Sequence, residues 1–405
     1  MPFRSASTST SAAVAASAAG MPKYSRVEAV WTRRAAASKR SRESGIRVIV
    51  GDGGLERERE QLGRLAAEPG GRMRQEPIPV VVSFPLTEQT RATIEGASPL
   101  VRILDYPTER IAPGAFRPPP TTEQADILAR AEVLFGSHLD PIAVHEAAPN
   151  LKWFQVLTAG LDELIEQGIL EHDFTITTMS GVGAVPIAEY CMGVMVMLEK
   201  DLHEAMRDQL EHRWNFHFAG QLKGKTCGIV GLGAIGRELA IRARAFGMRV
   251  VATRRSAEAG DTDPDVDVLL PSSELPQLLA DSDYVNLCVP LTPDTDGMIG
   301  ADELALMKPE AAIVNIARAT VIDTDALLEA LRAGRIAGAA LDVHDPEPLP
   351  EDSPFWDMPN VIVTPHRSGS IHGYFDRAAE FFAENLQRYV QGEPLANVVG
   401  RERGY

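Results

Sequence analysis

A glycine pattern near the middle of the chain constrains the fold most strongly. Gly231, Gly233 and Gly236 follow an apolar run at 226–230, and a helical pattern continues at 237–240. This order predicts a strand, a tight turn and a helix N-terminus in immediate succession. Glycine at these positions permits the turn, lets backbone approach a ligand, and lets the helix pack on the strand. Because a helix N-terminus binds phosphate, we expect a dinucleotide there; a glycine-rich turn without a ligand is the alternative.

Length and composition narrow the class of protein. A chain of 405 residues favours two domains, and a formal net charge of −16 argues against a nucleic-acid partner. Cys191, Cys227 and Cys288 lie far apart in apolar runs, which favours reduced core thiols over disulfides or a metal site. No apolar run reaches membrane-spanning length. We therefore expect a cytoplasmic protein without metal or membrane partners.

The first 75 residues form an extension of different composition. Residues 1–44 are rich in Ser, Ala and Arg, and their only acids are Glu28 and Glu43. This composition resembles an organelle transit peptide, which would imply an organelle location. A disordered tail is the alternative. A short strand is expected at 45–52, and no fold is assigned up to about 75.

Strands alternate with helices through the rest of the chain, which predicts parallel sheets with crossover helices. In the first part, strands are expected at 79–83, 101–104, 132–135, 151–157 and 174–178, and helices at 87–96 and 125–131. One long helix at 185–210 would connect to the second part. There, six strands are expected at 227–230, 249–252, 284–289, 312–316, 338–341 and 361–363, with helices at 235–245, 274–279 and 326–332 and a turn at 303–307. A final helix at 374–391 is expected to return to the first domain.

Three polar residues follow strands of the second part. Arg318, Glu347 and His366 each come after an apolar run, and the carboxyl ends of parallel strands share one edge. A guanidinium binds carboxylate or carbonyl oxygen, an imidazole transfers a proton, and a carboxylate orients the imidazole. With a hydride carrier, these groups interconvert a 2-hydroxy acid and a 2-keto acid. Taken singly, each has a structural alternative: a surface ion pair, a solvated loop acid or a turn cap.

The same residues carry a resemblance to a known family. The chain resembles the D-isomer-specific 2-hydroxyacid dehydrogenases, a group that includes glyoxylate/hydroxypyruvate reductases, from about residue 77 to 399. The matching segments lie at 151–162, 183–190, 228–236, 289–295, 314–318, 341–348 and 363–366. Their order and spacing make the resemblance specific.

The resemblance implies an α/β fold with two Rossmann-like, doubly wound parallel-sheet domains. The cofactor domain (199–368) would be inserted into a flavodoxin-like substrate domain (76–198), to which residues 369–405 return. It implies that Arg318, Glu347 and His366 are catalytic, that Arg318 with backbone at Thr158, Ala159 and Gly160 holds the substrate carboxylate, and that the protein is a homodimer. The implied cofactor-binding residues are Gly231, Gly233, Ala234, Ile235, Gly236, Thr253, Arg254, Arg255, Pro290, Thr295, Ile316, Ala317 and Asp342.

The chain also departs from the family pattern. Ala319 stands where members usually have Gly after the Arg, and Cys288 stands where many have His near the adenosine. We expect a slightly reshaped loop at the first position and altered adenosine binding at the second.

The end of the second strand of the cofactor domain bears on the choice of coenzyme. Arg254 stands where NAD-specific sites carry an acid, and the next carboxylate in sequence is Glu258. Arg254 and Arg255, with Thr253 and Ser256, suit a ribose 2′-phosphate. We therefore expect NADP(H) to be favoured over NAD(H), although loose selectivity with solvated arginines is the alternative.

The expected function is NADPH-dependent reduction of a small 2-keto acid such as glyoxylate or hydroxypyruvate. Formate dehydrogenase shares the fold, but it places Gln where this chain has Glu347. A dinucleotide-sensing co-repressor is an alternative of another class, because such proteins keep an Arg/Glu/His set. Residues 1–44 are the only candidate interaction tail for that role.

Overall fold

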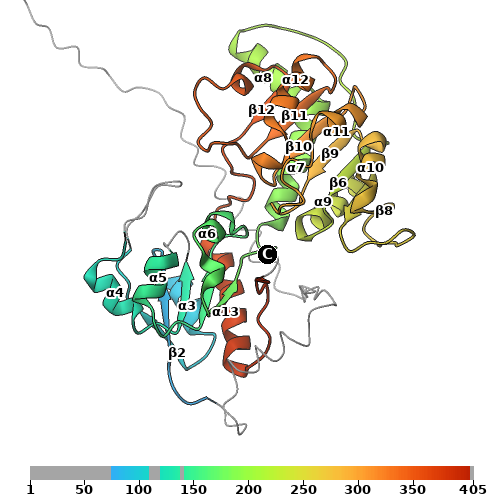
Figure 1. The fold of residues 1–405 in the computed structure, drawn as a ribbon. Coiled ribbons are helices and arrows are strands. Elements are labelled where there is room, and N and C mark those ends of the chain that lie inside the picture. Colours follow the sequence, from blue (N-terminus) through green and yellow to red (C-terminus); the bar gives the residue numbers. More distant parts are fainter. Residues whose placement is uncertain (1–73, 109–118, 137–140, 402–405) are drawn as a thin grey trace, which may run out of the picture. The chain divides into compact units, whose positions relative to one another are not determined.

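The computed structural model describes residues 74–108, 119–136 and 141–401. The expected strand at 45–52 and the targeting-like segment at 1–44 lie outside these residues. Within them, two parallel sheets form the frame of an α/β fold, as the sequence predicts (Figure 1). No helix in the described ranges is both long and apolar enough to cross a membrane.

The first sheet has five strands in the order β2-β1-β3-β4-β5, all parallel. Its strands are β1 (Ile78–Val82), β2 (Val101–Leu104), β3 (Val133–Gly136), β4 (Trp153–Val156) and β5 (Thr175–Thr177). The connections hold α3 (Glu88–Glu95), α4 (Thr122–Leu128), α5 (Pro141–Ala147), α6 (Asp162–Glu166) and η1 (Ile169–Glu171). The five strands expected from the sequence are confirmed, because strands buried on both faces appear as continuous apolar runs.

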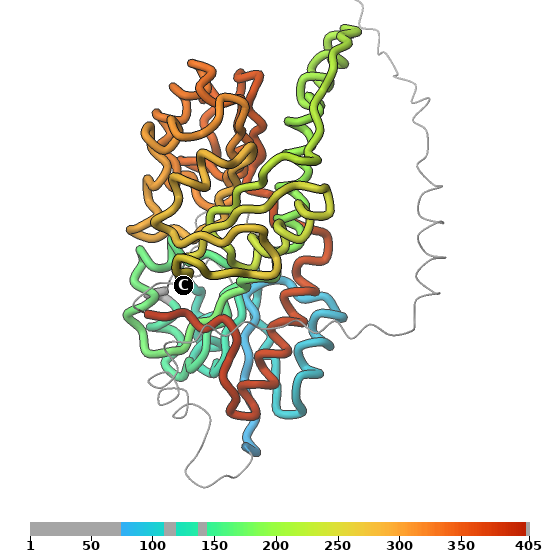
Figure 2. Tube along the Cα trace, turned by 90° about the vertical axis from the view of Figure 1, so that its right-hand side faces the viewer, coloured from blue at the N-terminus to red at the C-terminus, as the bar shows by residue number. Residues whose placement is uncertain are grey.

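The last helix, α13 (Tyr374–Gln391), covers one face of this first sheet. Its buried Phe382 ring lies 4.3 Å from the ring of Phe135 in β3 and 5.2 Å from that of Trp153 in β4, measured between centroids. Figures 1 and 2 both show α13 beside α3, and the two helices are in contact. The helix has the bounds that the sequence suggests, and it packs on the first sheet.

The expected single helix at 185–210 is wrong, because the chain forms two helices there. α7 (Ala184–Glu199) and α8 (Leu202–Leu210) are separated by Asp201, whose φ is 51°. A left-handed residue cannot continue a right-handed helix. The buried Glu199 carboxylate accepts a hydrogen bond from Tyr284 Oη at 2.6 Å and pairs with Lys225 Nζ at 2.9 Å. These contacts fix the end of α7 against the next sheet.

The second sheet has seven strands in the order β12-β11-β10-β9-β6-β7-β8. The strands are β6 (Thr226–Val230), β7 (Arg249–Arg254), β8 (Val268–Pro271), β9 (Tyr284–Leu287), β10 (Ala312–Asn315), β11 (Gly338–Leu341) and β12 (Val361–Val363). The connecting helices are α9 (Ala234–Ala245), η2 (Ser272–Glu274), α10 (Leu275–Asp281), α11 (Ala301–Leu306), η3 (Ala319–Val321), α12 (Thr324–Arg332) and η4 (Pro354–Asp357). The strand order reverses between β6 and β9, which is where ligands bind in open parallel sheets.

The expectation of six strands in this sheet is corrected to seven. The additional strand, β8, has four residues, pairs only with β7 in the described sheet and ends at Pro271. Because proline donates no backbone hydrogen bond, such a segment is confined to a sheet edge and gives little pattern in sequence.

Candidate functional site

The turn between β6 and α9 is built for a ligand that approaches the backbone closely. Gly231 has a φ of 102°, and a Cβ there would lie 2.9 Å from the carbonyl oxygen of Cys288. A Cβ on Gly236 would lie 2.4 Å from the carbonyl oxygen of Gly231. A Cβ on Gly233 would meet no described atom within 4 Å. Two glycines are therefore required by packing, while the space at the third suits a pyrophosphate.

The N-terminus of α9 supplies the donors. Gly233 is the N-cap and provides no side-chain cap, and the first backbone N–H to bond its carbonyl is that of Arg237. The N–H groups of Ala234, Ile235 and Gly236 precede that bond and are the orphan donors of a helix start. The residues present thus fit the phosphates of a dinucleotide.

The end of β7 meets the same turn. The carbonyl of Thr253 accepts hydrogen bonds from the N–H groups of Gly231 and Leu232, at 3.2 and 2.8 Å. Arg254 follows directly, so its side chain starts beside the proposed pyrophosphate site. Within the described residues, Arg254 Nε is buried without a hydrogen-bond partner.

The carboxylate of Asp263, which the sequence did not predict at this site, lies beside Arg254. Asp263 Oδ2 is 3.1 Å from Arg254 Nη1. The carboxylate of Asp263 also accepts hydrogen bonds from both terminal nitrogens of Arg237, at 3.0 and 2.8 Å. The hydrogen bonds from Arg237 hold the pKa of Asp263 below its usual range, although burial alone would raise it. The only sequence signal was the acidic run at 261–265, between two strands.

The other residues expected at the coenzyme follow the carboxyl ends of neighbouring strands. Thr295 Oγ1 donates to the carbonyl of Pro290 at 2.7 Å, which orders the loop after β9. Ile316 and Ala317 follow β10 and are nearly buried. Cys191, Cys227 and Cys288 are free thiols, as expected, and burial raises the pKa of Cys288 to about 12.

The imidazole of His366 and the carboxylate of Glu347 form a pair beyond β11 and β12. His366 Nδ1 lies 2.9 Å from Glu347 Oε2, and the backbone N–H of His344 donates to the other oxygen of Glu347 at 3.0 Å. The two side chains are 48% and 38% exposed. Because Glu347 contacts Nδ1, the ring atom that it leaves for a substrate is Nε2.

Asp342, which is fully buried directly after β11, fixes the backbone around His366 through hydrogen bonds. The Asp342 carboxylate accepts hydrogen bonds from Thr364 Oγ1, from the N–H of Arg367 at 2.9 Å and from the N–H of Ser368 at 2.8 Å. Its carbonyl accepts the N–H of His366 at 2.8 Å. His366 itself has a φ of 46°, a strained conformation for a residue with a side chain. The hydrogen bonds of Asp342 therefore hold this strained loop, and the imidazole on it, in one conformation.

Arg318 is placed by a different set of contacts. It follows β10, and its Nε and Nη2 both lie 2.7 Å from Asp162 Oδ2, at the start of α6. Its Nη1 donates to the carbonyl of Ala317 at 2.8 Å. The structure thus brings Arg318 to the loop of Thr158 and Gly160, whereas Glu347 pairs with His366. Asp162 is a second residue that sequence reasoning missed, since it is 156 positions from its partner.

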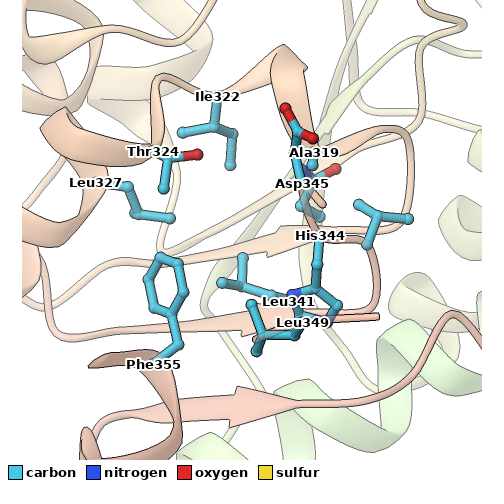
Figure 3. A pocket seen from close by; sticks show the side chains of 11 residues that line it. Ala319, Ile322, Thr324, Leu327, Leu341, His344, Asp345, Leu349 and Phe355 are labelled. Atoms are coloured by element: carbon cyan, nitrogen blue, oxygen red, sulfur yellow. The ribbon is translucent and has the colours of Figure 1, made fainter. Parts of the chain in front are cut away.

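A small pocket lies beside this site and is distinct from it. Figure 3 shows its lining, in which Ile322, Leu327 and Phe355 form an apolar part and His344 and Asp345 come from the loop after β11. Arg318, Glu347 and His366 do not line it.

Comparisons with known proteins identify similar sequences and structures. Residues 192–368 match the family described as D-isomer specific 2-hydroxyacid dehydrogenase, NAD binding domain. The chain is 34% identical to a glyoxylate reductase of Korarchaeum cryptofilum over 274 residues, which are 65% of this chain and 81% of the relative.

Solved structures give the same grouping. A D-isomer specific 2-hydroxyacid dehydrogenase from Xanthobacter autotrophicus Py2, in complex with NADPH and MES, is 29% identical with a TM-score of 0.67, and the match covers 82% of this chain and all of that one. An NADPH-dependent glyoxylate/hydroxypyruvate reductase from Sinorhizobium meliloti, in complex with NADP and sulfate, is 25% identical with a TM-score of 0.66 and the same coverage.

Proposed function

Since the chain belongs to the D-isomer specific 2-hydroxyacid dehydrogenases, we propose that it reduces small 2-keto acids of the glyoxylate or hydroxypyruvate type with NADPH. The observation that carries this proposal is the His366–Glu347 pair, which follows strands of the same sheet that holds the glycine turn. The co-repressor alternative finds no support in the relatives above, which are named as enzymes.

Each residue of the proposed site has a separate role in the reduction. Arg318 binds the substrate carboxylate and carbonyl oxygen, together with backbone at Thr158, Ala159 and Gly160. A bound nicotinamide supplies the hydride for C2 of the keto acid. His366 donates a proton from Nε2 to the carbonyl oxygen, and Glu347 at 2.9 Å stabilises the protonated ring before that transfer. The product is the 2-hydroxy acid, and the reverse reaction uses the same groups.

Turnover and binding measured together test this assignment. We expect purified enzyme to oxidise NADPH in the presence of glyoxylate or hydroxypyruvate. His366→Ala should abolish turnover while the Kd for NADPH, measured by its fluorescence, stays within about twofold. His372→Ala is the matched control, because it removes an exposed imidazole six positions away and should retain activity. Equal activity in the two variants would contradict the role of His366.

The preference for NADP(H) over NAD(H) is part of the proposal. Arg254 supports it through its position at the end of β7 and through its buried Nε, which has no hydrogen-bond partner in the part of the chain that the structure describes. Asp263 opposes it, because its carboxylate already contacts the Arg254 guanidinium. We expect Arg254→Asp to lower kcat/KM with NADPH and to raise kcat/KM with NADH, so that the ratio of the two falls. An unchanged ratio would refute the role of Arg254.

The expected homodimer has a candidate contact surface in α8 and the loop that follows it. Arg207 in α8 donates to the carbonyls of Met358 and Pro359, so this segment is attached to the second sheet. It exposes six large apolar side chains, an arrangement typical of an interaction surface. They are Leu202, Met206, Leu210, Trp214, Phe216 and Phe218. In light scattering, Trp214→Ser with Phe218→Ser should halve the mass, and an unchanged mass would exclude this surface.

A further inference from the structure

The ion pair between Arg318 and Asp162 has a geometry that leaves part of the guanidinium available. Arg318 Nε and Nη2 share Asp162 Oδ2, each at 2.7 Å, and Nη1 donates to the Ala317 carbonyl at 2.8 Å. A guanidinium has five N–H groups, of which these contacts use three. Among the contacts of the described residues, Nη1 and Nη2 therefore each retain one N–H. Two donors on adjacent nitrogens of a planar group are what a carboxylate or a keto acid requires.

We propose that Asp162 is a positioning residue, which keeps its contact with Arg318 while the 2-keto acid binds and so aims the two remaining N–H groups at the substrate. This inference rests on the proposed function and deepens it. Asp162 touches neither substrate nor coenzyme in this account; it acts through Arg318 alone.

The loop before Asp162 is shaped around the same guanidinium. A Cβ on Gly160 would lie 1.7 Å from Arg318 Nη2 and 3.0 Å from Asp162 Oδ2. Because the φ of Gly160 is not in the left-handed region, the glycine is needed for space and not for backbone conformation. Thr158 Oγ1 donates to the Gly160 carbonyl at 2.8 Å and orders the loop. Asp162 thus holds the guanidinium, and Gly160 leaves the space that its Nη2 occupies.

The opposite mechanism would have Asp162 occupy the place of the substrate carboxylate and leave on binding. The structure favours the positioning role on two grounds. The contact uses the Nε side of the guanidinium, so substrate can bind without displacing it. A released Asp162 would also place an unpaired carboxylate beside an anionic substrate, whereas the ion pair offsets its charge.

Two substitutions separate these mechanisms. If Asp162 positions Arg318, Asp162→Ala should raise KM for glyoxylate about tenfold and lower kcat, because the guanidinium loses its orientation. Asp162→Asn should recover part of the loss, since its amide oxygen still accepts a hydrogen bond from Nε. The Kd for NADPH should stay unchanged in both. A lower KM in Asp162→Ala, which the displaced-carboxylate mechanism requires, would overturn the proposal, and so would unchanged kinetics.

Two further variants test whether the effect of Asp162→Ala comes from its contact with Arg318. Glu163→Ala removes an exposed carboxylate from the next position of α6 and should leave KM and kcat as they are. Gly160→Ala should reproduce the rise in KM, because its methyl group displaces the guanidinium. If Gly160→Ala has wild-type kinetics, the loop does not hold Arg318 and the proposal fails.

A binding readout keeps this inference distinct from the proposed function. Oxalate is a small dicarboxylate that Arg318 can bind without turnover, and its affinity for the NADP-loaded protein can be measured by calorimetry. If the wild-type protein reduces none of the keto acids, the proposed substrate class fails. Weaker oxalate binding by Asp162→Ala would then still support the positioning role, and equal or tighter binding would overturn it.

Discussion

The buried carboxylate of Asp342 should be essential both for stability and for the position of His366. It accepts three hydrogen bonds from Thr364, Arg367 and Ser368, and it is fully buried. In Asp342→Asn, one oxygen becomes an NH2 group that faces a backbone N–H or a hydroxyl. An unpaired buried donor costs about 1–3 kcal/mol, and loss of charge assistance in the remaining bonds adds about 1 kcal/mol. We expect the free energy of unfolding to fall by about 2–4 kcal/mol.

Urea unfolding followed by tryptophan fluorescence measures this loss. The midpoint should fall while the slope stays unchanged, because the surface exposed on unfolding is the same. The kcat for keto-acid reduction should fall at least about tenfold, since the loop that presents His366 loosens. Asp352→Asn makes the same chemical change at an exposed position and serves as the control. If the two variants differ by less than about 0.5 kcal/mol and retain equal kcat, the proposed function of the Asp342 contacts is refuted.

Three other outcomes are expected. Glu347→Gln removes the carboxylate that contacts and orients the His366 imidazole, so kcat for keto-acid reduction should fall about tenfold while the Kd for NADPH stays unchanged; an unchanged kcat would exclude that partnership. Asp263→Asn frees Arg254 from its counter-charge, so the ratio of NADPH to NADH affinity should rise about three- to tenfold in fluorescence titrations, and a fall would contradict this. Burial alone would raise the pKa of Glu132, but its hydrogen bonds from Arg74 and Tyr389 lower it. Its ionised form therefore stabilises the fold above its unfolded-state pKa, a contribution lost on acidification. Glu132→Gln should thus flatten the decline of stability between about pH 5 and pH 3, and a steeper decline would oppose this.

The sheets were the most predictable part of the molecule, for a physical reason. Parallel strands are buried on both faces, so a run such as the one at 312–315 is apolar almost throughout. Such a strand can be identified from its own residues, without knowledge of the strands that pair with it. The break between α7 and α8 was not visible, because Asp201 is an ordinary helix residue in sequence and only its backbone conformation ends the helix.

The charged contacts of the site were the least predictable. Glu347 and His366 are 19 positions apart, and both follow strands, so their meeting could be anticipated from the sheet edge. Asp162 is the first residue of α6 and Asp263 lies in the loop before β8, and each contacts an arginine that was expected to bind a ligand. Neither position has a period or spacing in the sequence that specifies its partner. Such contacts can be identified only in the three-dimensional structure.

The position of α13 has a consequence for the synthesis of the protein. Phe382 covers Phe135 and Trp153, yet it is made about 230 residues after the second of them. At about 5–20 residues per second, the ribosome needs about 12–46 s to reach it. During that interval Phe135 and Trp153 lack the helix that covers them in the folded protein. A chaperone that binds apolar segments should therefore crosslink to the stalled chain before residue 374 emerges, and release it once residue 391 has left the exit tunnel.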